Sequence, residues 1–243
     1  MAKKICVLTG VGEATGACIA ERFARGGYEV VMVARNADRL ARIEKEISGT
    51  SAFPCDVGDL DALQDMIAAV RKDVGDPDVV IHNAVSATFD RFLEGNPDDL
   101  ERNFRVNTTA LLYLARGFAP AMVEAGSGAI IVTGNTAAVR GVPTYALFAP
   151  TKAAQRILAQ SLARDLGPQG VHVAYVVVDA AINAPWLGEE RPSWLTPPDH
   201  WSDKPEDYFI KPEAIADEVF HVAHQDRSAW SFDVEIRPYC EQW

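Results

Sequence analysis

The first residues whose types and spacing could do chemistry form a small-residue turn near the N-terminus. Gly10, Gly12, Thr15 and Gly16 lie between an apolar, β-branched run at 5–8 and a stretch with the period of a helix. Small residues here would let backbone N–H groups approach a pyrophosphate at the helix N-terminus, where the helix dipole favours negative charge. The turn therefore predicts a dinucleotide site, although glycine turns also serve plain packing of a helix on a sheet.

The next strand indicates which dinucleotide would bind. The run at 29–34 closes a β-α-β unit and ends at Arg35, where the adenosine ribose of the ligand would lie. An acidic residue there would accept hydrogen bonds from a free 2′-hydroxyl, whereas an arginine can pair with a 2′-phosphate. Arg35 thus favours NADP over NAD, while Glu13 in the turn would repel the extra phosphate. Arg35 could equally be a solvated cation at a strand end.

The cysteines and histidines show no spacing typical of a metal site or of a disulfide framework. They are Cys6, Cys18, Cys55 and Cys240, and His82, His172, His200, His221 and His224. His221 and His224 are one helical turn apart, but such a pair is more often part of a solvated face. We expect no metal.

Length and charge bound the class of protein. The chain has 243 residues, of which 48% are hydrophobic, enough for one large α/β domain with a substantial core. Its net charge of -11 argues against nucleic acid or an anionic membrane as a partner, because phosphates attract clustered lysines and arginines. No apolar stretch approaches the roughly 20 residues of a membrane span, and the N-terminus lacks the apolar core of a signal peptide. We therefore expect a cytoplasmic protein.

Strand-like runs alternate with helical periods along the chain, which predicts a single Rossmann-type, doubly wound α/β domain over residues 1–243. Its seven-stranded sheet should be mostly or wholly parallel. After the first unit, strands are expected at 52–55, 79–81, 129–133, 171–178 and 231–236, and helices at 37–47, 59–74, 98–117, 151–166 and 212–223. Open sheets of this kind bind ligands at the carboxyl ends of their strands.

The alternation breaks between residues 185 and 212, where prolines and tryptophans crowd a segment without a clear period. The tryptophans are Trp186, Trp194 and Trp201. Long loops in compact domains are often functional, and prolines suit neither helix nor strand. Because the segment follows the carboxyl end of the sixth strand, we predict a flap over a small-molecule substrate. A structural excursion or a subunit contact is equally compatible with it.

Taken together, the motifs resemble the short-chain dehydrogenase/reductase family over almost the whole chain. They are the turn from Thr9 to Gly16, Asp56-Val57, His82-Asn83-Ala84-Val85, Val106-Asn107, Asn135, Phe148-Ala149-Pro150-Thr151-Lys152, and Asp179-Ala180 followed by Ile182. Two positions depart from the catalytic pattern of the family. Phe148 stands in place of the catalytic Tyr, and Asn135, thirteen positions earlier, in place of the catalytic Ser.

The resemblance implies a nicotinamide dinucleotide and assigns its contacts. Asp56 and Val57 would meet the adenine, Asn83 and Ala84 would line the cofactor site, Lys152 would hold the nicotinamide ribose, and the backbone of Ile182 would contact the carboxamide. NADP is the expected cofactor, with NAD as the alternative.

In the family that the chain resembles, Tyr moves the proton of the substrate oxygen, Lys lowers the pKa of that Tyr, Ser orients the carbonyl and Asn fixes a water. Phe148 has no group to titrate. Lys152 and Asn107 could keep their cofactor and water roles. Asn135 could donate a hydrogen bond to an oxyanion through its amide, but it cannot supply a proton.

Catalysis would then need another proton donor, and general acid help is worth about 10²–10⁴-fold in rate. Tyr145, three residues before Phe148, could reach the same pocket. Asp179 could act as an acid if burial at the strand end favours its protonated form. A water bound to Lys152 and the substrate itself are further donors. The plainer interpretation is that Tyr145 is a packing aromatic and Asp179 a hydrogen-bonded strand terminus.

Two functions of different classes fit these residues. The first is an NADP-preferring oxidoreductase that acts on a small carbonyl or alcohol with an atypical proton donor, which we favour because most proteins of this fold are of that kind. The second is a dinucleotide-binding protein without redox chemistry, such as a sensor, a scaffold or an inactive subunit. A weaker third is a lyase or isomerase that uses the same pocket, since a fold alone does not settle a function.

The resemblance also implies a homodimer or homotetramer formed through the helices at 98–117 and 151–166. Apolar positions on these helices could belong to the subunit contact or to the core; they are Leu111, Leu112, Leu114, Ile157, Leu158 and Leu162. The C-terminal Arg237-Pro238-Tyr239 and Trp243 could join the contact.

Overall fold

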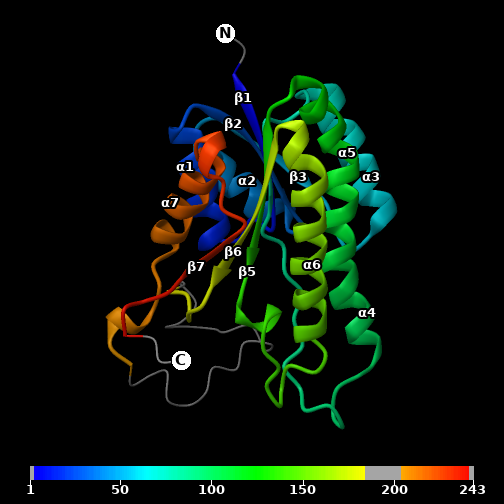
Figure 1. Cartoon of the computed structure of the whole chain (residues 1–243), viewed down its shortest axis with the longest axis vertical. Coiled ribbons are helices and arrows are strands. Elements are labelled where there is room, and N and C mark those ends of the chain that lie inside the picture. Colours follow the sequence, from blue (N-terminus) through cyan, green and yellow to red (C-terminus); the bar gives the residue numbers. More distant parts are fainter. Residues whose placement is uncertain (1–2, 184–203, 241–243) are drawn as a thin grey trace.

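A parallel β-sheet runs through the centre of the protein (Figure 1). The computed structural model describes residues 3–183 and 204–240. The sheet has seven strands in the order β3-β2-β1-β4-β5-β6-β7, and every neighbouring pair is parallel. The strands are β1 (Lys4–Thr9), β2 (Tyr28–Ala34), β3 (Thr50–Pro54), β4 (Val79–His82), β5 (Gly128–Gly134), β6 (Val171–Val178) and β7 (Asp233–Ile236). The predicted Rossmann-type fold is confirmed, and the sheet is wholly parallel.

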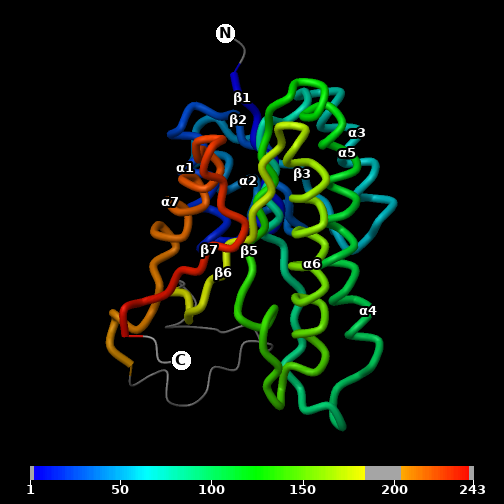
Figure 2. The backbone as a smooth tube through the Cα atoms, in the orientation of Figure 1, coloured from blue at the N-terminus to red at the C-terminus, as the bar shows by residue number. Residues whose placement is uncertain are grey.

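Helices cover both faces of the sheet (Figure 1, Figure 2). One face carries α1 (Thr15–Arg25), α2 (Ala37–Glu46) and α7 (Pro212–Ala223), and the other carries α3 (Leu60–Asp73), α5 (Ala110–Ala125) and α6 (Ala149–Leu166). Side chains alternate between these layers along a strand. In β2, Val30 and Met32 join the core beneath α1, while Val31 and Val33 join the core beneath α5.

The helical segment before α5 is not the single helix that the sequence predicts over 98–117. It begins as α4 (Asp98–Phe104), passes through a π-helical turn at Arg105–Thr109, and continues as α5 to Ala125. A π-turn inserts an extra residue into the helical ladder and often marks a functional site. Here it contains Asn107, one of the predicted catalytic residues.

Gly117 does not end this helix, so the predicted boundary is wrong. A Cβ at Gly117 would lie 2.6 Å from the side chain of Ile67 in α3, which means that glycine allows α3 and α5 to pack closely. The helix instead ends at Gly126, whose φ of 58° is readily adopted only by glycine.

Backbone hydrogen bonds join the two sides of the predicted flap. Ile182 and Ile210 form a parallel bridge, Asn183 N donates to Ile210 O at 2.8 Å, and Ile210 N donates to Ala181 O at 2.9 Å. Residues 184–203, which include most of the predicted flap and its three tryptophans, lie outside the described residues. In the part of the chain that the structure describes, no helix is both long and apolar enough to cross a membrane.

Candidate functional site

The small-residue turn between β1 and α1 is shaped by two glycines and left open by a third. Gly10 has a φ of +77°, and a Cβ there would overlap the backbone of Ala84; a Cβ at Gly16 would lie 2.6 Å from Val11 Cα. Gly12 differs, because its φ is not positive and a Cβ there would meet nothing within 4 Å. Packing therefore requires Gly10 and Gly16, whereas Gly12 keeps a space clear.

That open space lies at the start of α1, which begins at Thr15. No side chain caps this helix end, so its first N–H groups lack the usual side-chain acceptor. The helix dipole adds partial positive charge at the same place. An open, uncapped helix start fits the pyrophosphate of a dinucleotide.

Arginines gather where β2 ends, beside the turn. Arg35 follows the last residue of β2, and Arg39 and Arg42 lie on α2. We expected Glu13 to repel an added phosphate. Its carboxylate instead pairs with Arg42, and its Oε1 lies 4.0 Å from Arg39 Nε. Its charge is therefore balanced within the protein, and the objection that Glu13 raised against a 2′-phosphate loses its force.

The floor of the turn is tied together by Asn83, which directly follows β4. Asn83 Nδ2 donates to Gly10 O at 2.8 Å, and its Oδ1 accepts from Thr133 Oγ1 at 2.9 Å. These bonds fix the carboxyl ends of β1, β4 and β5 to one another. In this sheet order the chain turns from one half to the other between β1 and β4, the position at which open α/β sheets bind ligands.

Asp56 and Val57 follow β3 at the same edge. Asp56 is exposed, and its Oδ1 accepts a hydrogen bond from Gly58 N at 2.9 Å. The side chain of Val57 is buried in the core. Asp56 can therefore present a carboxylate oxygen to a ligand, whereas Val57 can offer its backbone.

His82, which was not expected to bind a metal, connects the turn to the π-turn that contains Asn107. Its Nδ1 lies 3.0 Å from Thr9 Oγ1 and its Nε2 lies 3.0 Å from Val106 O. Burial, together with the nearby charge of Lys152, lowers the pKa of His82 to about 4. The neutral ring therefore donates from Nε2 to Val106 and accepts from Thr9, which holds the π-turn against β1.

Asn107 is fully buried on that π-turn and uses its side chain within the protein. Its Oδ1 accepts from Ser86 N at 2.9 Å, and its Nδ2 donates to Ser86 O and to Thr151 Oγ1, both at 2.8 Å. Both amide hydrogens are thus committed, and the side chain clamps the loop after β4 to α6. The backbone carbonyl of Asn107 accepts a further bond, at 2.6 Å, from Gln155 Nε2.

Lys152 lies in α6 with only 2% of its surface exposed. Its Nζ donates to Thr133 O at 3.3 Å and to Gln155 Oε1. Burial lowers the pKa of Lys152 to about 7. Among the described residues no carboxylate forms an ion pair with it, so at neutral pH this amine is balanced between its charged and uncharged forms.

Phe148 occupies the position one helical turn before Lys152, and its ring is sealed among other rings. It is 2% exposed and makes edge-on contacts with Phe89 and Tyr145 at centroid distances of 5.3 and 5.8 Å. Phe148 therefore serves as packing at the place where a hydroxyl would be expected. Tyr145 is more exposed than Phe148.

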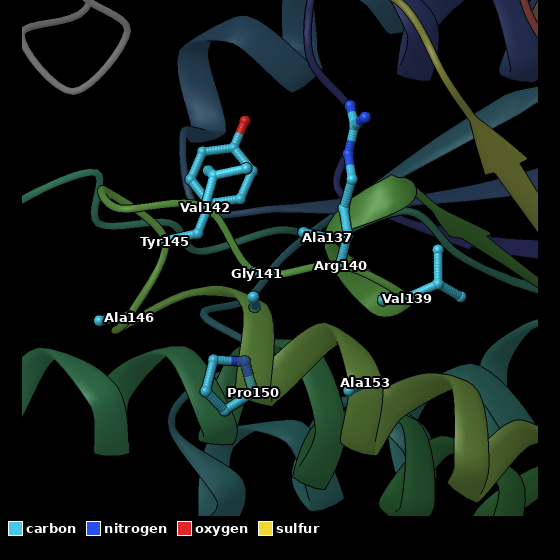
Figure 3. Close-up of a pocket in the computed structure, with 11 residues that line it drawn as sticks. Ala137, Val139, Arg140, Gly141, Val142, Tyr145, Ala146, Pro150 and Ala153 are labelled. Atoms are coloured by element: carbon cyan, nitrogen blue, oxygen red, sulfur yellow. The ribbon is translucent and has the colours of Figure 1, made fainter. Parts of the chain in front are cut away.

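A shallow cavity of about 370 Å³, widely open to solvent, lies beside this aromatic cluster. Its walls come from the loop after β5 and from the start of α6; they are formed by Ala137, Ala138, Val139, Arg140, Gly141, Val142, Tyr145, Ala146, Ala149, Pro150 and Ala153. Figure 3 shows Arg140 and Tyr145 extending from the loop, with Pro150 and Ala153 on the helical wall opposite. The lining is mainly apolar, and Arg140 and Tyr145 supply its long polar side chains.

Asn135 and Asp179 complete the predicted set. Asn135 caps a short 3₁₀ helix through its Oδ1, which accepts from Ala137 N at 3.2 Å, so its Nδ2 faces the other way. The Asp179 carboxylate is buried and lies 3.9 Å from Arg140 Nη2. Asp179 is therefore the partner of an arginine that lines the cavity. Ile182, held by its bridge to Ile210, lies at the same end of β6.

The structure thus brings the predicted residues to one edge of the sheet. The sequence of the chain matches, over residues 4–189, the family model described as short chain dehydrogenase. The chain belongs to the short-chain dehydrogenase family. Four polar residues of the site had no role assigned from the sequence: His82, Ser86, Thr151 and Gln155.

Known proteins resemble this short-chain dehydrogenase over most of its length. An uncharacterized oxidoreductase of Staphylococcus aureus strain MRSA252 is 26% identical over 240 residues, with 97% of each chain covered. Versicolorin reductase of Emericella nidulans is 31% identical over 193 residues, which are 77% of this chain and 73% of that protein. The crystal structure of a metagenomic short-chain oxidoreductase in complex with NADP has a TM-score of 0.81 and 27% identity, with 98% of both chains covered.

Proposed function

We propose that this short-chain dehydrogenase is an NADP-preferring oxidoreductase that transfers a hydride between the cofactor and a small carbonyl or alcohol, with an atypical proton donor. The observation that carries the proposal is the open turn at Gly12 in front of the uncapped start of α1. Arg35, Arg39 and Arg42 lie beside it, and the charge of Glu13 is balanced by Arg42 and Arg39, which favours a ligand with an additional phosphate. The metagenomic relative in complex with NADP supports the same cofactor.

The proposed cofactor contacts follow the carboxyl edge of the sheet. Gly10, Gly12, Thr15 and Gly16 would surround the pyrophosphate, Arg35 the 2′-phosphate, Asp56 and Val57 the adenine, Asn83 and Ala84 the floor, Lys152 the nicotinamide ribose, and the backbone of Ile182 the carboxamide. When bound, NADPH would supply the hydride that adds to the carbonyl carbon.

Tyr145 is the proton donor that the geometry favours. It lines the cavity and contacts Phe148, and a phenol hydroxyl can donate toward a developing oxyanion. Asp179, the other candidate, is engaged by Arg140. Asn135 would assist by directing its Nδ2 toward the same oxygen, because its Oδ1 is occupied by Ala137 N.

The second candidate function, dinucleotide binding without redox chemistry, is favoured by one observation. The ring at position 148 lacks a hydroxyl and is sealed by Phe89 and Tyr145. A protein of this kind would keep the cofactor site and lose turnover.

The two functions are separated by titrating the protein with NADPH and NADH and then measuring NADPH oxidation with a panel of small aldehydes and ketones. We expect tighter binding of NADPH, and slow turnover that falls in Asn107→Ala and Lys152→Ala. Tyr145→Phe should lower kcat by about 10²-fold, whereas Tyr113→Phe, a matched control away from the cavity lining, should not. Binding without any turnover would establish the second function, and failure to bind either nucleotide would refute both.

We also propose that the protein acts in the cytoplasm as a single domain and assembles as a homodimer or homotetramer. Of the predicted contact residues, Leu111 and Leu114 are fully buried in the core, whereas Leu112 and Ile157 are 37% and 55% exposed. Leu158 and Leu162 are partly buried against the same core. The exposed pair on α5 and α6 is therefore the part of the set available to a second subunit, and sedimentation of Ile157→Glu against the unaltered protein tests this.

A further inference from the structure

Gln155, to which the proposed chemistry gives no role, lies at the centre of a buried polar cluster. It is fully buried in α6, three residues after Lys152. Its Nε2 donates to Asn107 O at 2.6 Å, and its Oε1 accepts from Lys152 Nζ and, at 3.2 Å, from Tyr175 OH. Each polar atom of this carboxamide therefore has a partner, and the partners come from three separate elements: the π-turn, α6 and β6.

The orientation of the carboxamide is fixed by these partners. Turning it over would place its oxygen against the carbonyl oxygen of Asn107 and its NH₂ group against the amine of Lys152. Both contacts would oppose like partial charges in a buried place, where an unpaired polar group is costly. The oxygen of Gln155 is thus held facing Lys152.

We propose that Gln155 is a positioning residue that anchors Lys152 to the π-turn of Asn107 and presents to it an uncharged acceptor. A carboxylate at this position would pair with the amine and hold it charged, whereas an apolar side chain would leave it with Thr133 O alone. Gln155 holds Lys152 Nζ in place through a hydrogen bond without adding a charge. The amine can therefore gain or lose a proton near neutral pH, in accord with the lowered pKa of Lys152.

Other titratable groups around the pair do not replace this acceptor. His82, at the end of β4, is neutral near pH 7, because burial and the charge of Lys152 lower its pKa to about 4. Tyr175 approaches from β6, and burial raises its pKa. The ion pair of Arg156 and Asp233 lies beyond Tyr175 and acts on it with opposite signs.

The role in turnover rests on the proposed function, but the anchoring itself is measurable without cofactor or substrate. Lysine labelled with ¹³C at Cε reports the protonation of each amine by NMR, and Lys152 is assigned by the signal that disappears in Lys152→Met. In the unaltered protein we expect its titration midpoint near pH 7. Gln155→Glu should raise the midpoint by roughly 1–3 pH units, because an opposite charge in contact favours the ammonium. Gln155→Met should lower it, because the charged form loses an acceptor.

Gln160→Glu is the matched control, since it makes the same chemical change on the same helix. It lies eight positions after Lys152 in the helix, a rise of roughly 12 Å, which exceeds the Debye length of about 8 Å at physiological salt. Its midpoint should stay with that of the unaltered protein. Circular dichroism checks that each variant is folded. If Gln155→Glu does not fold, Gln155→Met still tests the proposal.

Turnover gives a second readout. If the protein reduces a carbonyl, the pH at which kcat is half-maximal should move with the NMR midpoint in Gln155→Glu, while the KM for the carbonyl stays unchanged because Gln155 does not line the cavity. The proposal is overturned if the folded Gln155 variants titrate like the unaltered protein, or if Gln160→Glu moves the midpoint as far. Failure to bind NADPH would refute the proposed function and leave the titration result standing.

Discussion

Gly12 lies in the turn between β1 and α1, at a position where neither the backbone conformation nor the packing of the protein requires a glycine. Its φ is not positive, and a Cβ there would meet no atom within 4 Å. Gly12→Ala should therefore leave the fold intact. It should raise the free energy of unfolding by about 0.4–1 kcal/mol, because alanine restricts the unfolded chain more than glycine does.

The same methyl group would stand in front of the uncapped start of α1 and push a pyrophosphate away from its N–H groups. Losing one hydrogen bond to a charged group removes about 1.5–3 kcal/mol. The Kd for NADPH should accordingly rise by roughly 10-fold to 150-fold. A single substitution would thus stabilise the protein and weaken its ligand.

Urea unfolding and isothermal titration calorimetry with NADPH measure the two effects on the same samples. Gly167→Ala is the matched control, because Gly167 at the end of α6 has a φ of -55° and a Cβ there also meets nothing. It should share the gain in stability and keep the affinity. If Gly12→Ala binds NADPH as tightly as the unaltered protein does, the turn is not the phosphate site and the reasoning fails.

Three further substitutions test the catalytic side of the site. Phe148→Tyr should raise carbonyl reduction by about 10²–10⁴-fold, since Lys152 lies one turn away; unchanged kcat would mean that the remaining groups are not aligned. The pKa of His82 is lowered from 6.5 to about 4. Between these pH values the unfolded chain therefore binds a proton more readily than the folded protein does. The free energy of unfolding should fall as pH drops through this window, by about 3 kcal/mol at most. His82→Asn should flatten this dependence in unfolding curves measured from pH 7 to pH 4, and an unaltered slope would argue against a neutral, buried ring. The pKa of Lys152 is lowered from 10.5 to about 7, so Lys152→Met should raise the Tm at pH 7 and the gain should shrink toward pH 10; a gain that is constant with pH would show that buried charge is not its cause.

The fold was predictable because every element carries its own signal. Apolar runs of strand length, helical periods and the glycines of the first turn are local features, and each agrees with the same parallel sheet. Where prediction failed, a distant contact was responsible. Gly117 looked like a helix end because glycine is a poor helix former, but it serves the approach of Ile67 from another helix.

The site was predictable only in part, for the same reason. The family resemblance assigned Phe148, Lys152 and Asn107 to one site, yet nothing local shows that the amide of Asn107 is already committed to Ser86 and Thr151. Gln155 gave one local sign, a polar residue on the face of α6 that also carries Lys152. Its partners on other elements become visible only once the chain is folded.

The bonds of Asn83 have a consequence for how the protein is made. They join Gly10 to a residue 73 positions later and that residue to Thr133, 50 positions further on. While the ribosome still holds the stretch that becomes β5, a nascent chain can close the first β-α-β unit but has no partner for the Asn83 carbonyl oxygen. The floor of the turn is therefore completed only after more than half of the polypeptide has emerged.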